Sequence, residues 1–253
     1  MKFETGMRRA LAFILGCSLA TVGGAHAADK KDKPKAAANQ TVDSGAFGVF
    51  VKGQRVASET FKIEQQNGVS IIKSELKEAS GANPAWQKSE LQLSASGELL
   101  RYEWSQSAGG SLSLFPENEF LKERITAPGQ AKPAEQPFLL PATTPVLDNN
   151  FFIHREVLAW RYLAVAPCKS ENGARQCQPA DFGAVIPQDR TSMSVRLELV
   201  GKERITIHGA ERELLRLNLS AEDLQWSLWV DENDHFKLIR VAIPADNTVV
   251  DRD

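Results

Sequence analysis

His154 and Arg161 are the pair of residues whose types and spacing best suit the binding of a charged ligand. They stand seven positions apart in a segment with helical periodicity, and residues seven apart share a helix face because about 3.6 residues complete a turn. A cation that faced a cavity from such a helix would bind an anionic head group or a carboxylate. The alternative is that the pair forms the solvent-exposed edge of an amphipathic helix.

The other polar motifs predict no catalytic or metal centre. The sequence contains no Gly-x-Ser-x-Gly elbow, His-Glu-x-x-His motif, P-loop or Gly-x-Gly-x-x-Gly motif, which are signatures of hydrolases, metalloproteases and nucleotide-binding proteins. His208 and His235 are scattered, and the acidic run at 231–234 lacks the spaced oxygen ligands of a calcium loop. We therefore expect a protein that is not an enzyme and uses no cofactor or metal.

Apolar residues supply the remaining candidate ligand contacts. They are Trp160 beside the polar pair, Trp226 in the second half of the chain, and the triplet Phe138, Leu139 and Leu140. The triplet lies in a proline-rich insert, 127–146, where five prolines argue against regular structure. The insert either links two domains or packs its triplet onto a sheet as a lid, and the second reading is favoured. The alternative for the tryptophans is a place in the core.

The helix that carries the polar pair is predicted over residues 148–164. Asp148 is a suitable N-cap, and Leu147 and Phe152 occupy the positions of a hydrophobic staple. Apolar residues cover most of the helical circumference, which is typical of a helix buried on several sides. A curved sheet that wraps over the helix provides such an environment.

Strands are predicted on both sides of the helix. Apolar and polar residues alternate over 45–126 and again over 195–243, which indicates strands with one buried face. Turns are expected at 52–54, at Asn67-Gly68 as a type I′ turn, and at 201–203. The predicted fold class is mainly β: a strongly curved antiparallel meander, or half-barrel, that wraps one central α-helix within a single domain, 45–253.

The first residues have the pattern of an export signal. Residues 1–27 combine a basic start, an apolar run and the small-x-small sequence Ala25-His26-Ala27, so we expect an exported, periplasmic protein. The alternative is a lipid anchor on Cys17, which follows Ile14-Leu15-Gly16. Residues 28–44 are rich in lysine and alanine and are expected to form a flexible tether. Beyond the signal, no stretch is long and apolar enough for a transmembrane segment.

The two remaining cysteines fit an oxidising compartment. Cys168 and Cys177 flank a polar stretch with Asn172-Gly173 near its middle, and such a loop can fold back and close a disulfide. The alternatives are a redox pair and half of a metal site, although the spacing is not that of a Cys-x-x-Cys motif. The charge balance, with 30 basic and 32 acidic residues, argues against a nucleic-acid partner.

The order of these segments resembles a known architecture. The predicted helix with its opening segment 147–152, together with strands ending at 228–231 and 238–241, is similar to a group of uncharacterised secreted bacterial proteins. These look like the half-barrel superfamily of the periplasmic lipoprotein carrier LolA. The resemblance implies an open curved sheet with a lipid-facing cavity under its helix, and hence binding or carriage of a lipophilic ligand or acyl chain. The alternative is an envelope protein–protein interaction module with a filled core.

Overall fold

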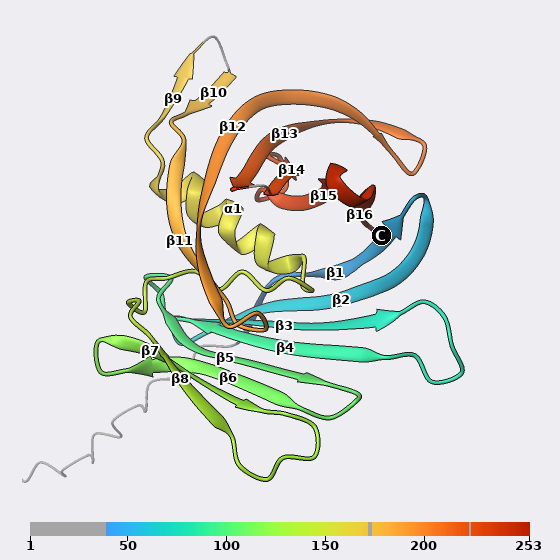
Figure 1. The fold of residues 1–253 in the computed structure, drawn as a ribbon. Helices are drawn as coiled ribbons and strands as arrows, with labels where there is room; N and C mark the ends of the chain where they lie inside the picture. The colour runs from blue at the N-terminus through green and yellow to red at the C-terminus, as the bar shows by residue number, and fades with distance from the viewer. Residues whose placement is uncertain (1–38, 172–173, 223) are drawn as a thin grey trace, which may run out of the picture. The chain divides into compact units, whose positions relative to one another are not determined.

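The computed structural model describes residues 39–171, 174–222 and 224–253. The predicted signal (1–27), with Cys17, lies outside the described residues, as do the tether up to residue 38 and the Asn172-Gly173 turn. The described residues are mainly β, with the α-helix α1 (Ile153–Val165) and a short 3-10 helix, η1 (Pro244–Asp246) (Figure 1).

The strands belong to one large sheet and one small ribbon. Their bounds are β1 (Gln40–Val51), β2 (Gln54–Gln66), β3 (Val69–Glu78), β4 (Trp86–Leu93), β5 (Leu99–Gln106), β6 (Ser111–Glu117), β7 (Phe120–Thr126), β8 (Ala134–Phe138), β9 (Cys168–Glu171), β10 (Ala174–Cys177), β11 (Ala180–Ile186), β12 (Thr191–Ile207), β13 (Ala210–Ala221), β14 (Leu224–Asp231), β15 (Lys237–Ile243) and β16 (Thr248–Arg252).

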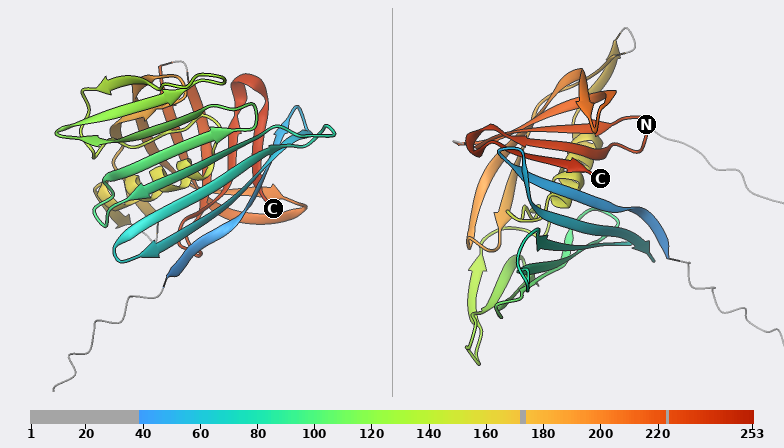
Figure 2. Two further views of the ribbon diagram at one scale, coloured as in Figure 1. Left: turned by 90° about the horizontal axis from the view of Figure 1, so that it is seen from below. Right: turned by 90° about the vertical axis from the view of Figure 1, so that its right-hand side faces the viewer.

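The large sheet joins two meanders through the ends of the domain. It has 14 strands in the order β11 to β16, then β1 to β8, and β9 and β10 form a separate two-stranded sheet. The junction is the antiparallel pair β1 and β16, in which Phe47 lies opposite Arg252. α1 packs against one face of this sheet (Figures 1 and 2). The prediction of a mainly β fold with one large antiparallel sheet and one helix is therefore confirmed.

Local turn chemistry explains the first hairpins. Asn67 and Gly68 both have positive φ, and Gln66 pairs with Val69 across them. Two consecutive residues with positive φ make the turn whose twist matches that of the flanking strands. Lys52 and Gly53 do the same between β1 and β2. Both predicted turns are confirmed.

The third predicted turn, at residues 201–203, is wrong. β12 runs without a break from Thr191 to Ile207, and Gly201 pairs with Arg216 on β13. The pairing register shifts between Leu199 and Gly201, and Gly201 has a φ of 137°. A glycine within a strand often marks such a bulge, because it accommodates a backbone that other residues resist. The turn signal therefore marked an irregularity of one long strand.

The proline-rich insert contains regular structure, contrary to the expectation for residues 127–146. Residues 134–138 form β8, which pairs with β7 and places Pro137 opposite Lys122. β8 is the last strand of the sheet. An edge strand tolerates proline because its outward backbone groups need no partner.

The strand and helix boundaries differ from prediction at two further points. β1 begins at Gln40, within the expected tether, because the buried Asp43 carboxylate pairs with Arg252 at 2.7 Å. The helix begins at Ile153 instead of residue 148 and ends at Val165, and its N-cap position is Phe152. Asp148 is therefore not the N-cap. β11 and β16 were not predicted from alternation.

The predicted disulfide is confirmed. Cys168 and Cys177 lie opposite each other on β9 and β10 and are bonded. Closing a ring of this size contributes about 2.5–3 kcal/mol on the chain-entropy view of disulfides.

The apolar core has two parts. The main core combines the inner sheet face with α1, and a smaller cluster surrounds Leu214 and Trp229. Within the described residues, no helix has the length and apolarity needed to span a bilayer.

Candidate functional site

An apolar cavity of about 340 Å³ lies along α1, between the helix and the turn that joins β4 to β5. This volume falls at the lower end of the range of about 300–1,000 Å³ typical of small-molecule sites. The cavity is lined by Leu91, Leu93, Ala95, Ser96, Gly97, Pro145, Val146, His154, Val157, Leu158, Trp160, Arg161, Ala164 and Val165. The structure thus brings three sequence-predicted residues, His154, Trp160 and Arg161, to one cavity.

Among the described residues that line this cavity, Arg161 is the one cation, and it is half-buried. Its Nη1 donates a long hydrogen bond of 3.5 Å to the Gly97 carbonyl, and its guanidinium lies 6.0 Å from the centroid of the Phe182 ring. Burial lowers the pKa of Arg161, and no neighbouring charge offsets this effect. Among the residues that the structure describes, no carboxylate forms an ion pair with Arg161. Its charge is therefore left without a compensating partner.

His154 does not supply a second cation. Its side chain is 1% exposed, so the alternative of a solvent-exposed polar edge is wrong for this residue. Burial, assisted by the nearby Arg155 charge, lowers the pKa of His154 to about 3. Nδ1 accepts a hydrogen bond of 3.4 Å from the Asp148 backbone N–H, which leaves the ring proton on Nε2. The predicted cationic pair is therefore a neutral imidazole and a single charged guanidinium.

The two candidate tryptophans lie in different places. Trp160 is half-buried, and its indole N–H donates to the Phe236 carbonyl at 3.0 Å while the residue lines the α1 cavity. Trp226 instead lines an open groove of about 610 Å³ together with Phe152. The Arg155 guanidinium lies 4.5 Å from the Trp226 ring centroid. Trp226 thus belongs to the region where the helix begins.

The predicted lid triplet does not line the α1 cavity. Phe138 is buried in the core and Leu140 packs against it, whereas Leu139 is 77% exposed. Successive side chains of an extended segment point to opposite faces, so three consecutive residues at the end of β8 cannot all face the core. The expectation that all three pack against the sheet is wrong for Leu139.

A buried polar cluster at the first turn of α1 was missed from the sequence. Glu59 on β2 accepts hydrogen bonds from the backbone N–H groups of Phe152 at 2.6 Å and Ile153 at 3.2 Å, and from the Ser74 hydroxyl at 2.7 Å. A strand therefore caps the helix in place of a local side chain. Burial raises the pKa of Glu59 to about 7 in spite of these hydrogen bonds. The available signal was a glutamate among the inward residues of β2.

Asp148 and Arg155 complete the same cluster. The Asp148 carboxylate accepts hydrogen bonds from the Tyr102 hydroxyl, the Gln188 amide and, at 2.7 Å, the Asn150 backbone N–H. Burial raises the pKa of Asp148. Arg155 donates to the carbonyls of Asp148 and Phe151, and its own pKa is lowered to about 10 by burial. Asp148 is thus a buried acceptor that fixes the segment before the helix.

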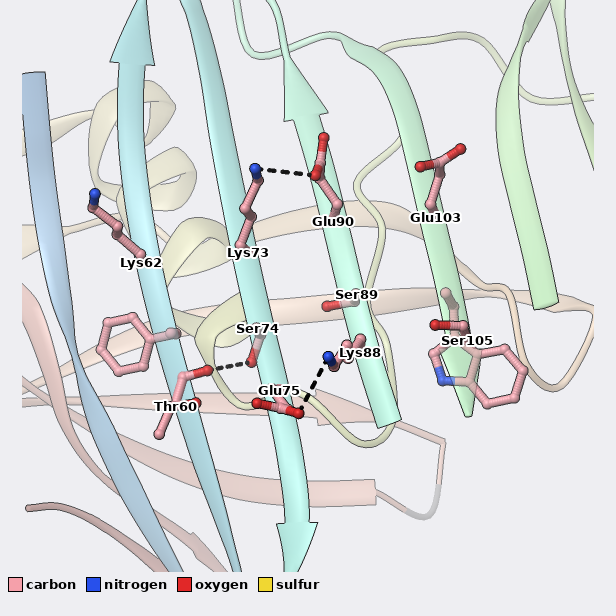
Figure 3. A pocket seen from close by; sticks show the side chains of 12 residues that line it. Thr60, Lys62, Lys73, Ser74, Glu75, Lys88, Ser89, Glu90, Glu103 and Ser105 are labelled. Carbon is pink, nitrogen blue, oxygen red and sulfur yellow. Dashed lines mark hydrogen bonds and ion pairs between the residues drawn. The ribbon is translucent and has the colours of Figure 1, made fainter. Parts of the chain in front are cut away.

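The opposite face of the sheet carries a hollow of a different kind. Figure 3 shows charged side chains from β2 to β5 that line an open depression of about 490 Å³. Lys73 lies 3.5 Å from Glu90, and Lys88 lies 3.4 Å from Glu75. These lysines and glutamates neutralise one another and are partly exposed to water, so each pair is worth little. The hollow therefore has no excess charge to select a ligand.

Metal chemistry and known relatives give no further assignment. In the described part of the chain, no group of three or more His, Cys, Asp or Glu side chains is arranged to hold a metal ion. His208 and His235, which belong to no metal-binding motif in the sequence, are both exposed. Comparison of the chain with known protein families, with curated proteins and with solved structures found no match.

Proposed function

We propose that this protein binds and carries a lipophilic molecule or acyl chain in the cavity along α1. The observation that supports the proposal is an apolar cavity of about 340 Å³ bounded by the helix and the β4–β5 turn. Its deep wall is formed by residues such as Leu91 and Leu158, which are almost wholly buried. Small-molecule sites are mostly apolar and contain only a few polar groups, and this cavity has that composition.

The framework around the cavity favours a site that exists before the ligand arrives. Glu59 joins the start of α1 to β2, and Trp160 joins its middle to the Phe236 carbonyl. The Tyr162 hydroxyl donates to the Gln178 carbonyl at 3.1 Å, which joins the later part of the helix to the segment before β11. A helix held at three points keeps the cavity open, so less ordering entropy is lost on binding.

We also propose that the large sheet is a half-barrel. A half-barrel of the kind found in the LolA superfamily has one helix packed against an open sheet. In this protein, the turn between β11 and β12, at one end of the strand order, contacts β7 and β8 at the other end. Gln136 on β8 donates to the Arg190 carbonyl at 3.2 Å, and Arg190 lies 3.7 Å from Glu123 on β7. Export to the periplasm by residues 1–27, with a lipid anchor at Cys17 as the alternative, places the proposed carrier in the bacterial envelope.

The test is to identify what the protein carries. Cells express the full chain, the protein is purified natively, and an organic extract is analysed by mass spectrometry against a mock purification. We expect a lipophilic compound in stoichiometric amount. Val157→Phe fills the cavity and should abolish its recovery, whereas Leu163→Phe, on the same helix but away from the cavity lining, should not. A clean extract from folded wild-type protein that also binds no added amphiphile would overturn the proposal.

A second candidate function is an envelope interaction module. Phe120 on β7 is 44% exposed, and Leu139, directly after the paired strand β8, is 77% exposed. Two large apolar side chains near one sheet edge favour a protein partner. The test is crosslinking in the envelope with the double variant Phe120→Ser/Leu139→Ser. Loss of a specific adduct in this variant, but not in Leu100→Ser on β5, would support the module; an unchanged adduct pattern would exclude this surface.

A further inference from the structure

We infer that the ligand of the α1 cavity has an anionic head group, bound by Arg161 at the cavity mouth, and an apolar body enclosed by the deeper wall. The inference rests on the proposed binding function and adds the chemical class of the ligand. It is carried by the position and surroundings of Arg161.

The first step concerns the partners of the buried and half-buried arginines. Arg155 donates to the Phe151 carbonyl at 2.6 Å, and Arg252 pairs with Asp43 at 2.7 Å and with Glu156 at 3.3 Å. Arg161, by contrast, has within the described residues a 3.5 Å contact with the Gly97 carbonyl and a 6.0 Å contact with the Phe182 ring, but no carboxylate partner. Removing a cation from water without a counter-charge is costly. A bound anion would supply the partner that the protein itself lacks.

The second step concerns the charge of the cavity. No described aspartate or glutamate lines it, and burial keeps His154 neutral. Arg161 therefore gives the cavity a single positive charge in apolar surroundings, where charge interactions are stronger than in water. Such a site attracts an anion and repels a cation. A neutral head group would leave the charge of the guanidinium uncompensated.

The third step concerns the direction of the ligand. Arg161 is half-buried, whereas Leu91 and Leu158 are 1% and 2% exposed. The charged end of the cavity is therefore the end nearer to solvent. A volume of about 340 Å³ has room for about eleven groups of the size of a water molecule, which is also about the size of a methylene group. A single medium-length chain with its head at Arg161 fits this space.

The test uses three amphiphiles that share an apolar chain and differ in the head group. Decanoate, decyl phosphate and decanol are titrated by calorimetry into protein purified from cells that express the full chain and then freed of lipid. Decanol should bind through the apolar wall alone. One charge-assisted interaction is worth about 1.5–3 kcal/mol, so at least one of the two anions should bind about tenfold or more tightly than decanol. The comparison of carboxylate with phosphate identifies the head group.

Variants at Arg161 separate this inference from the function on which it rests. Arg161→Gln should remove the preference for the anions, so that they bind no more tightly than decanol, and Arg161→Lys should retain part of the preference. Arg196→Gln is the matched control, because it removes one positive charge at an exposed site paired with Asp181. Equal binding of all three amphiphiles to the wild type would overturn the inference and leave the proposed function standing. Binding of none would overturn both.

Discussion

The two ends of α1 differ in how their polar groups are used. At the first turn, Glu59, Asp148 and Arg155 are buried: Glu59 accepts from the Phe152 backbone N–H, and Arg155 donates to the Asp148 carbonyl. Near the last turns, Arg161 stands beside an apolar cavity without a carboxylate partner among the described residues. Buried polar groups that are held by several hydrogen bonds specify structure. A charge that lies beside an apolar cavity, with no carboxylate partner among the described residues, is available for a ligand.

The comparison also shows why altered pKa values alone do not locate a site. Burial raises the pKa of Glu59 to about 7, a change typical of catalytic carboxyls. Yet neither Glu59 nor Asp148 lines the α1 cavity, and both bind backbone N–H groups near the start of the helix. The Glu59 carboxyl holds the start of α1 in place, whereas the charge that faces the proposed ligand is that of Arg161, farther along the helix.

Removing the carboxyl of Glu59 should have the largest effect. Glu59→Leu leaves the Phe152 and Ile153 N–H groups without their acceptor and removes a negative charge near Arg155. Breaking a buried charged network of this kind costs about 3–5 kcal/mol of unfolding free energy. Denaturant unfolding measures it. Glu64→Leu, on the same strand in a partly exposed pair with Lys62, is the control and should cost under about 1 kcal/mol. Equal losses would show that Glu59 is not a structural cap.

The titration of the Glu59 carboxyl should make the unfolding free energy depend on pH. Its pKa is 4.5 when unperturbed and about 7 in the folded protein, so the folded state holds the proton more tightly. The contribution of Glu59 is fully present below pH 4.5 and is lost as pH rises to about 7; at about 1.4 kcal/mol per pKa unit, this is on the order of 3 kcal/mol.

The measurement is the unfolding free energy of the wild type and of Glu59→Gln across this pH range. The difference between the two curves isolates one titration from all others. We expect the wild type to lose stability relative to the variant as pH rises. Parallel curves would mean that Glu59 titrates as an ordinary carboxyl.

A pair of tyrosines provides a graded comparison between the two regions. Tyr102 donates to the buried Asp148 carboxylate, whereas Tyr162 donates to the neutral Gln178 carbonyl at 3.1 Å. Hydrogen bonds to charged groups contribute about 1.5–3 kcal/mol and neutral ones about 0.5–1.5 kcal/mol. Tyr102→Phe should therefore destabilise the protein more than Tyr162→Phe in thermal unfolding. The reverse order would contradict the assignment of the charged cluster to the start of the helix.

Local patterns predicted the elements whose causes are local. Alternation and the Asn67-Gly68 turn identified β2 and β3, because one face of each strand is apolar and the turn needs positive φ at adjacent residues. The first residues of β1 were missed because an inward position carries Asp43, whose partner Arg252 is 209 residues away. The strand at Pro137 was missed because its position at the sheet edge depends on the order of all the other strands.

The same limit applies to the candidate site. Helical spacing placed His154 and Arg161 on one face, and both line one cavity. The charge of His154 was not predictable, because it depends on burial and on the neighbouring Arg155. The true cap of the helix was not predictable either, since Glu59 lies 93 residues before Phe152. Both depend on contacts that only the folded sheet creates.

The smallest effect on stability is expected at Arg161, the residue expected to select the head group of the ligand. Arg161→Gln removes a long hydrogen bond and a distant contact with the Phe182 ring, but no ion pair within the described residues. The unfolding free energy should therefore change by less than about 0.5 kcal/mol, as for substitutions away from buried networks. Arg155→Gln should cost several times more, because the Arg155 side chain is buried and contacts both backbone carbonyls and two aromatic rings. Comparable losses for the two variants would mean that Arg161 also maintains the fold, and the division of α1 into a structural and a ligand-facing end would fail.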